Sequence, residues 1–187
     1  MKALVKQSTS LDVPVFQAIY ETVQGGFVLD ETVLALGTTV KQGTVIGFDE
    51  ATRKAKVAKY AVNLNASSTS DTTYEVAKGH NLAVGMSVKI AGGTAQLISG
   101  INTTNPSFDV ITVGTTLSAS AVAAGVAIYV DDDGFTKAGG LLFDELDVAV
   151  GADVTVLNRG TVYERRIAPV PAVIKALMPN IIFSQSF

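Results

Sequence analysis

The stretch that decides the fold of this 187-residue chain runs from residue 72 to residue 130: TTYEVAKGHNLAVGMSVKIAGGTAQLISGINTTNPSFDVITVGTTLSASAVAAGVAIYV. Short runs of β-branched and aromatic residues alternate with Gly, Asn and Ser turns about every 8–12 residues, which is typical of a small sandwich or barrel. The runs that we expect to be strands are 74–76, 87–90, 95–98, 108–113 and 126–130.

The flanks of this stretch are also rich in strand-forming residues, and they are separated from it by polar segments. The segment before it, residues 63–71, reads NLNASSTSD, and the segment after it, 131–134, is an acidic turn. Polar, turn-rich crossings of this kind are typical of domain boundaries. We therefore predict three parts: an extended N-terminal arm (1–15), a β scaffold (16–65 and 131–187) and an inserted, outward-projecting β module (66–130). The scaffold strands 45–48 and 154–157 must then pair or pack across the insertion.

Periodicity predicts the remaining elements of a mainly β fold with one or two short helices. Phe16, Ile19, Tyr20 and Val23 follow helical spacing, which predicts a short helix over 16–23, with a strand as the alternative. The other predicted elements are a hairpin of 154–158 with 160–164, a short helix over 172–177 after two prolines, and an apolar strand over 181–183.

Composition narrows the function classes. The chain is 48% hydrophobic but only 17% charged, with a net charge of −3 and no cysteine. Disulfides, a thiolate nucleophile and cysteine-based zinc sites are therefore excluded. The sequence lacks a broad basic face with aromatic platforms, and it lacks a long apolar run. We accordingly expect neither nucleic acid nor a membrane as a partner. We also expect synthesis in the cytoplasm, without a signal peptide.

The candidate catalytic and metal-binding residues are few. His80 is the only histidine, and a hydrogen-bonding role in its turn explains it more simply than catalysis. Asp131–Asp133 resembles a calcium loop but lacks the downstream glutamate, so we expect a solvated turn, with a weak structural cation as the alternative. Asp144, Glu145 and Asp147 could act as paired carboxylates, but a polar loop accounts for them. We predict no enzymatic activity and no cofactor.

Three segments carry a resemblance to a known family. They are 43–47 (GTVIG), 133–142 (DGFTKAGGLL) and 154–167 (VTVLNRGTVYERRI). In this order they are similar to the "G-T-V-L-G", "D-G-x-x-K-A-x-G-(I/L)-L" and "V-x-V-x-x-R-G-x-V" segments of tailed-phage head decoration proteins. Within the central stretch, 76–82 (VAKGHNL) and the following Val84-Gly85 resemble head fiber proteins of crAss-like phages.

The resemblance implies a decoration-protein-like β scaffold and a non-enzymatic subunit on the outer surface of the virion capsid, either a head fiber or a cementing subunit. Its partners would be the major capsid protein and further copies of itself, as a homotrimer, together with host-surface glycans or other fiber proteins. The arm residues expected to contact the capsid are Lys2, Leu4, Val5, Lys6 and Leu11. The apolar C-terminus predicts an oligomer interface of Ile181, Ile182, Phe183 and Phe187.

A carbohydrate-binding or adhesive β module is the alternative function. Solvent-facing aromatic rings in the central stretch would favour it, because sugars stack on such rings. The aromatic residues there are Tyr74, Phe108 and Tyr129, all at strand-like positions.

Overall fold

The computed structural model describes residues 14–30 and 34–185, and its fold is mainly β with two short α-helices. In chain order the elements are β1 (Phe16–Leu29), β2 (Thr39–Val40), β3 (Val45–Asp49), β4 (Lys54–Val57), β5 (Tyr60–Val62), β6 (Thr73–Ala77), β7 (Ser87–Val88), β8 (Gln96–Asn102), β9 (Phe108–Val113), β10 (Ala127–Tyr129), α1 (Asp133–Thr136), β11 (Ala138–Leu142), β12 (Leu146–Asp147), β13 (Asp153–Tyr163), a 3₁₀ turn (Glu164–Arg166), α2 (Ala172–Leu177) and β14 (Ile181–Ser184).

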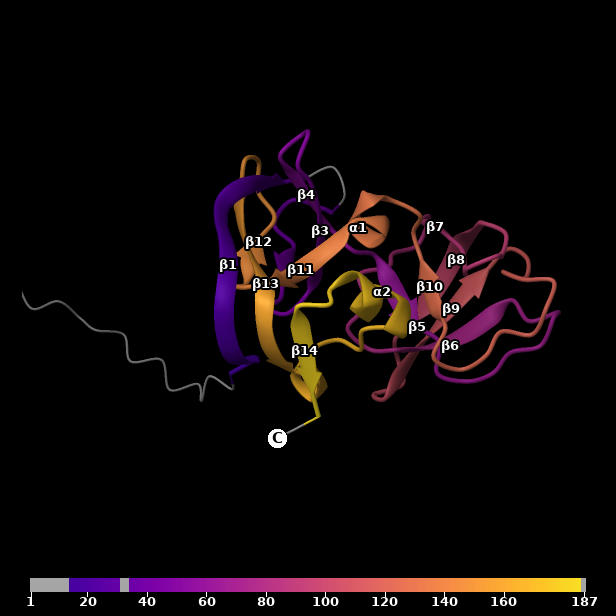
Figure 1. Cartoon of the computed structure of the whole chain (residues 1–187). Coiled ribbons are helices and arrows are strands. Elements are labelled where there is room, and N and C mark those ends of the chain that lie inside the picture. Colours follow the sequence, from indigo (N-terminus) through magenta and orange to yellow (C-terminus); the bar gives the residue numbers. More distant parts are fainter. Residues whose placement is uncertain (1–13, 31–33, 186–187) are drawn as a thin grey trace, which may run out of the picture.

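The scaffold is a closed five-stranded barrel (Figure 1). Its strands follow the order β1-β4-β3-β11-β13, and β13 returns to β1 to close the ring. Full closure leaves these strands without free edges. The predicted strands 45–48 and 154–157 do not pair, because β11 lies between β3 and β13 and bonds to both. They do pack across the insertion, since Ile46 shares a buried cluster with Val154 and Val156.

The module is a half-barrel sheet of four antiparallel strands in the order β6-β9-β8-β7, at the opposite end of the molecule from β1 (Figure 1). Alternate residues of β6 and β9 point into its core, where Tyr74, Val76 and Ile111 are almost fully buried. The predicted strands of the central stretch and the mainly β fold class are thereby confirmed.

A two-stranded ladder of β5 and β10 joins the scaffold to the module. Successive side chains of a strand point to opposite faces. On one face, Tyr60 and Ala127 belong to the scaffold core, and on the other face, Ala61 and Ile128 belong to the module core. The ladder therefore contributes to both cores, although β10 falls within the predicted module.

The predicted helix over 16–23 is wrong, because this segment is the first half of the long strand β1. β1 pairs with β13 through several register shifts, including those between Phe16 and Ala18 and between Ile19 and Glu21. Each extra residue reverses which face the following side chains occupy. Among the residues at helical spacing Phe16 is buried, whereas Ile19 and Tyr20 are 51% and 68% exposed, so the spacing does not mark one buried face.

The predicted hairpin over 154–164 is also wrong, because β13 is one continuous strand. Gly160 is not a turn residue. A Cβ atom there would lie 2.5 Å from the Ala18 carbonyl oxygen, so Gly160 permits the close approach of β1.

The predicted C-terminal helix and strand are confirmed as α2 and β14. No helix in the described part of the chain is long and apolar enough to span a membrane.

Candidate interaction surface

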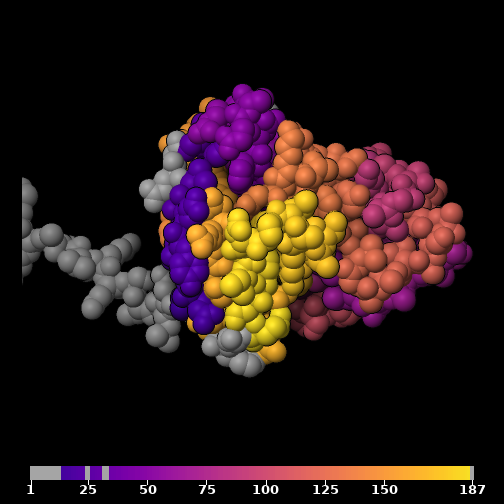
Figure 2. Space-filling model, in the orientation of Figure 1, coloured from indigo at the N-terminus to yellow at the C-terminus, as the bar shows by residue number. Residues whose placement is uncertain are grey.

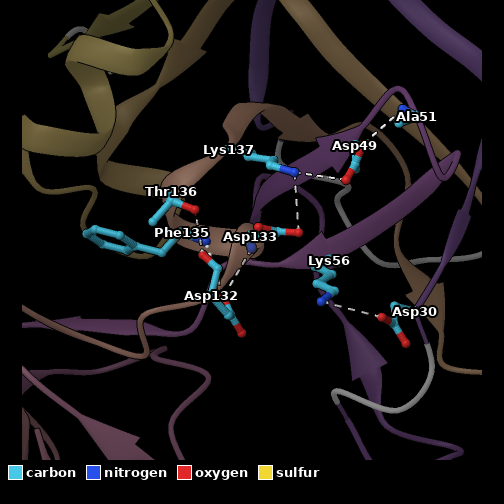
Figure 3. Close-up of polar contacts among 10 residues, drawn as sticks. Asp30, Asp49, Ala51, Lys56, Asp132, Asp133, Phe135, Thr136 and Lys137 are labelled. Carbon is cyan, nitrogen blue, oxygen red and sulfur yellow. Dashed lines mark hydrogen bonds and ion pairs between the residues drawn. The ribbon is translucent and has the colours of Figure 1, made fainter.

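The acidic turn that leaves the module starts α1 and lies against the scaffold (Figure 3). One oxygen of Asp132, Oδ1, accepts hydrogen bonds from the backbone N–H groups of Gly134 (3.0 Å) and Phe135 (3.3 Å), so Asp132 is the N-cap of α1. Its other oxygen, Oδ2, lies 3.3 Å from Nζ of Lys59, whose side chain is only 10% exposed. One carboxylate thus anchors both the helix and the segment before β5.

The neighbouring carboxylates turn toward other lysines. Asp131 accepts a hydrogen bond of 2.6 Å from Lys89 in the module, whereas Asp133 lies 3.4 Å from Nζ of Lys137. Lys137 also donates to Asp49 on β3 at 2.8 Å, and this bond lowers the pKa of Asp49 and raises the pKa of Lys137 (Figure 3).

The acidic turn is therefore a set of separate ion pairs. Across residues 14–30 and 34–185, no group of three or more His, Asp or Glu side chains is arranged to hold a metal ion. The predicted carboxylate group at 144–147 is exposed, and Asp147 accepts a hydrogen bond of 2.6 Å from Thr39.

The C-terminal segment forms an exposed apolar face on the scaffold. Val173 and Leu177 of α2 are 52% and 45% exposed, and Ile182 of β14 is 62% exposed. Both elements, in yellow, lie on the face seen in Figure 2, and β13 separates β14 from β1. Among the described strands β14 pairs only with β13, so one edge of β14 is left without a strand partner.

The predicted interface residues fall on different sides of this segment. Ile181 is buried in the scaffold core, and Phe183 packs against that core with Nζ of Lys175 5.1 Å from its ring centre. Only Ile182 of the three faces solvent. Phe187 and the predicted capsid-contact residues of the arm (Lys2, Leu4, Val5, Lys6 and Leu11) lie outside the described residues.

A basic groove lies where the module meets the scaffold. It has a volume of about 530 Å³, and segments 39–44 and 165–169 of the scaffold and 78–81 of the module line it. Its cationic residues are Lys41, Lys78, Arg165 and Arg166, and no Asp or Glu is among the described residues that line it. Nothing in the sequence predicted this groove, because its basic residues lie far apart along the chain. The adjacent arginines at 165 and 166 were the one available signal.

His80 forms part of the groove wall, with its side chain only 7% exposed. Its Nδ1 accepts a hydrogen bond of 3.2 Å from the backbone N–H of Leu82, so the neutral ring carries its proton on Nε2. Nε2 lies 3.3 Å from Oδ2 of Asp109, but without the geometry of a hydrogen bond. Burial lowers the pKa of His80, and the attraction of Asp109 opposes that shift. The predicted hydrogen-bonding role of His80 in its turn is confirmed.

The described part of the chain thus presents an exposed apolar face, a basic groove and several separate ion pairs near the junction of scaffold and module. No protein-family model, curated protein or solved structure matches the chain.

Proposed function

We propose that the chain is a non-enzymatic structural subunit of a phage virion that binds the outer surface of the capsid as a head fiber or decoration subunit. The observation that carries the proposal is the arrangement of the three segments that resemble head decoration proteins. They lie on β3, on α1 with β11, and on β13, which are neighbours in one barrel although they are far apart in sequence.

Several glycines of these segments lie where two parts of the chain approach each other closely. A Cβ atom on Gly47 would lie 2.7 Å from the Gly134 carbonyl oxygen, and one on Gly134 would lie 2.6 Å from that of Val57. A Cβ on Gly140 would lie 2.5 Å from the Leu157 carbonyl oxygen. The segments therefore share one packing arrangement, and this supports treating them as a single pattern.

The proposed assembly is a homotrimer whose C-terminal face meets a neighbouring copy. Exposed apolar side chains beside a strand edge without a strand partner are a liability for a lone monomer, because they favour association. Val173, Leu177 and Ile182 provide such a surface. Contact with the major capsid protein is assigned to the arm.

The alternative, a carbohydrate-binding module, finds less support in the geometry. Tyr74 is buried and its hydroxyl donates to the Asp71 carbonyl at 2.9 Å. The ring of Tyr129 stacks on Phe135 with 3.9 Å between centroids, and Phe108 is half-buried. The rings of Tyr74 and Tyr129 are therefore engaged in packing within the protein.

The test is co-sedimentation with heads assembled from the capsid protein encoded beside this chain. The full chain should sediment with heads, and a variant lacking residues 2–12 should keep its circular dichroism spectrum but stay in the supernatant. A full chain that never sediments with heads would contradict the function. Unchanged binding by the truncated chain would contradict only the role of the arm.

A further inference from the structure

We propose that the basic groove binds an acidic segment of another polypeptide, held in extended form across the junction between scaffold and module. This inference goes beyond capsid attachment, because the described residues that line the groove belong neither to the arm nor to the C-terminal apolar face. Its walls come from both parts of the molecule, so a bound segment would contact scaffold and module at once.

The charge of the groove is the first argument. The chain as a whole is acidic, with a net charge of −3, but the described lining carries four cationic side chains and no carboxylate. The nearby carboxylates are already engaged. Asp109 accepts a bond of 2.5 Å from Lys78, and Glu164, next to Arg165, accepts hydrogen bonds from Lys175 and Gln185.

The cations differ in how firmly they are held. Lys78 is fixed by Asp109 and by the Thr103 carbonyl at 3.2 Å, and Arg166 donates to the Pro14 carbonyl at 2.6 Å. Lys41 is exposed at the rim. Arginine and lysine side chains in one groove suit a ligand with two or more carboxylates, because arginine binds a carboxylate through two parallel N–H donors.

The lining of the groove favours a polypeptide over a nucleic acid or a glycan. Its volume of about 530 Å³ lies within the range of about 300–1,000 Å³ typical of small-molecule sites, so it holds only a few residues of a longer segment. Ile167, Ala168 and Pro169 give one wall an apolar stretch for the aliphatic parts of a peptide. Bases and sugars bind by stacking on exposed aromatic rings. The only ring in the described lining, that of His80, is buried.

The experiment measures fluorescence anisotropy of a labelled peptide of alternating Glu and Leu, titrated with the full chain at low and at physiological salt. The matched peptide has Gln at every Glu position. The test variant is Lys41→Gln with Arg165→Gln, and the matched control is Arg159→Gln, an exposed arginine on β13 outside the groove. Circular dichroism of each variant checks its fold.

We expect saturable binding of the Glu peptide that weakens with salt, no binding of the Gln peptide, and a loss of at least tenfold in affinity for the double variant only. Equal weakening by Arg159→Gln would show non-specific attraction and overturn the proposal. Tighter binding of a single-stranded oligonucleotide or of heparin than of the Glu peptide would overturn it in favour of those ligands. No binding of the Glu peptide would also overturn it, and this result would leave the head-binding experiment untouched.

Discussion

At the scale of single residues, Asp132 makes two separable contacts, and two substitutions divide them. Asp132→Asn keeps an oxygen that can cap α1 but removes the charge opposite Lys59, whereas Asp132→Ala removes both. Loss of an N-cap costs about 1 kcal/mol. We therefore expect both variants to lower the free energy of unfolding, with Asp132→Ala lower by about 1 kcal/mol more, measured by urea denaturation. Equal values for the two variants would show that the cap contributes nothing.

His80 predicts a dependence of stability on pH. Burial lowers the pKa of His80 in the folded chain below the ordinary value of 6.5. Between these two pKa values the unfolded chain therefore binds a proton that the folded chain does not bind. The free energy of unfolding should thus be unaffected by His80 well above pH 6.5 and should fall as the pH drops through 6.5 toward the folded pKa. The charged groups facing the ring are Asp109 on β9, which opposes the shift, and Lys78, which adds to it.

The comparison is with His80→Asn, whose side-chain oxygen can still accept from the Leu82 N–H. Denaturation at pH 7.5, 6.5 and 5.5 should show a steeper loss of stability for the natural chain than for the variant. Parallel curves for the two proteins would assign the pH dependence to other groups.

At the scale of elements, α1 lies directly on β3, and Gly47 makes this possible. A Cβ atom at Gly47 would overlap the backbone carbonyl oxygens of Asp133 and Gly134. Forcing extra atoms into a packed site costs about 1–3 kcal/mol. Gly47→Ala should therefore lower the thermal midpoint by several degrees. Gly100→Ala on β8, where a Cβ meets nothing within 4 Å, is the control and should leave the midpoint nearly unchanged.

The edge formed by α2 and β14 predicts the oligomeric state. Burying a large aliphatic side chain contributes about 1.5–3 kcal/mol. Replacing Leu177 and Ile182 by Ser should therefore convert the proposed trimer to monomers, as measured by light scattering, and should leave the circular dichroism spectrum unchanged. Val150→Ser, at a side chain that is 76% exposed, is the control and should remain trimeric. A natural chain that stays monomeric at high micromolar concentration would contradict this prediction.

Sequence reasoning succeeded for elements whose signals are local and failed where a distant strand decides the outcome. Two prolines and helical spacing suffice to predict α2, and glycine turns suffice for the module strands. The strand over 16–23 was only the alternative to a helix, because its pairing partner β13 lies more than a hundred residues later. Gly160 looked like a turn because nothing local reveals that β1 approaches it. The basic groove was invisible for the same reason, since only the fold brings segments 39–44, 78–81 and 165–169 together.

At the scale of the whole molecule, the ladder of β5 and β10 determines where the module can be removed. Asn63 and Val126 are the last residues of this ladder on the module side, joined by a hydrogen bond of 2.9 Å from the Asn63 N–H to the Val126 carbonyl oxygen. Beyond them, the chain belongs to the module. On the scaffold side, Ala127 packs in the scaffold core and Tyr129 stacks on Phe135.

Two deletions should therefore behave differently. Replacing residues 64–125 by Asn-Gly joins β5 and β10 in a hairpin with a favoured two-residue turn. The same variant carries Ile128→Thr, because deletion of the module would expose this apolar side chain. This variant should unfold cooperatively and keep the β-type circular dichroism spectrum of the scaffold.

Replacing residues 70–131 by a Gly/Ser linker removes β10, so the scaffold core loses Ala127 and the stacking of Tyr129 on Phe135. The different linker lengths of the two variants change the free energy of unfolding only slightly, because the entropic cost of closing a loop grows slowly with its length. Circular dichroism and thermal unfolding should then rank the 64–125 deletion as the more stable. If both variants are unfolded, scaffold and module share one cooperative core, and if both are equally stable, β10 contributes nothing to the scaffold.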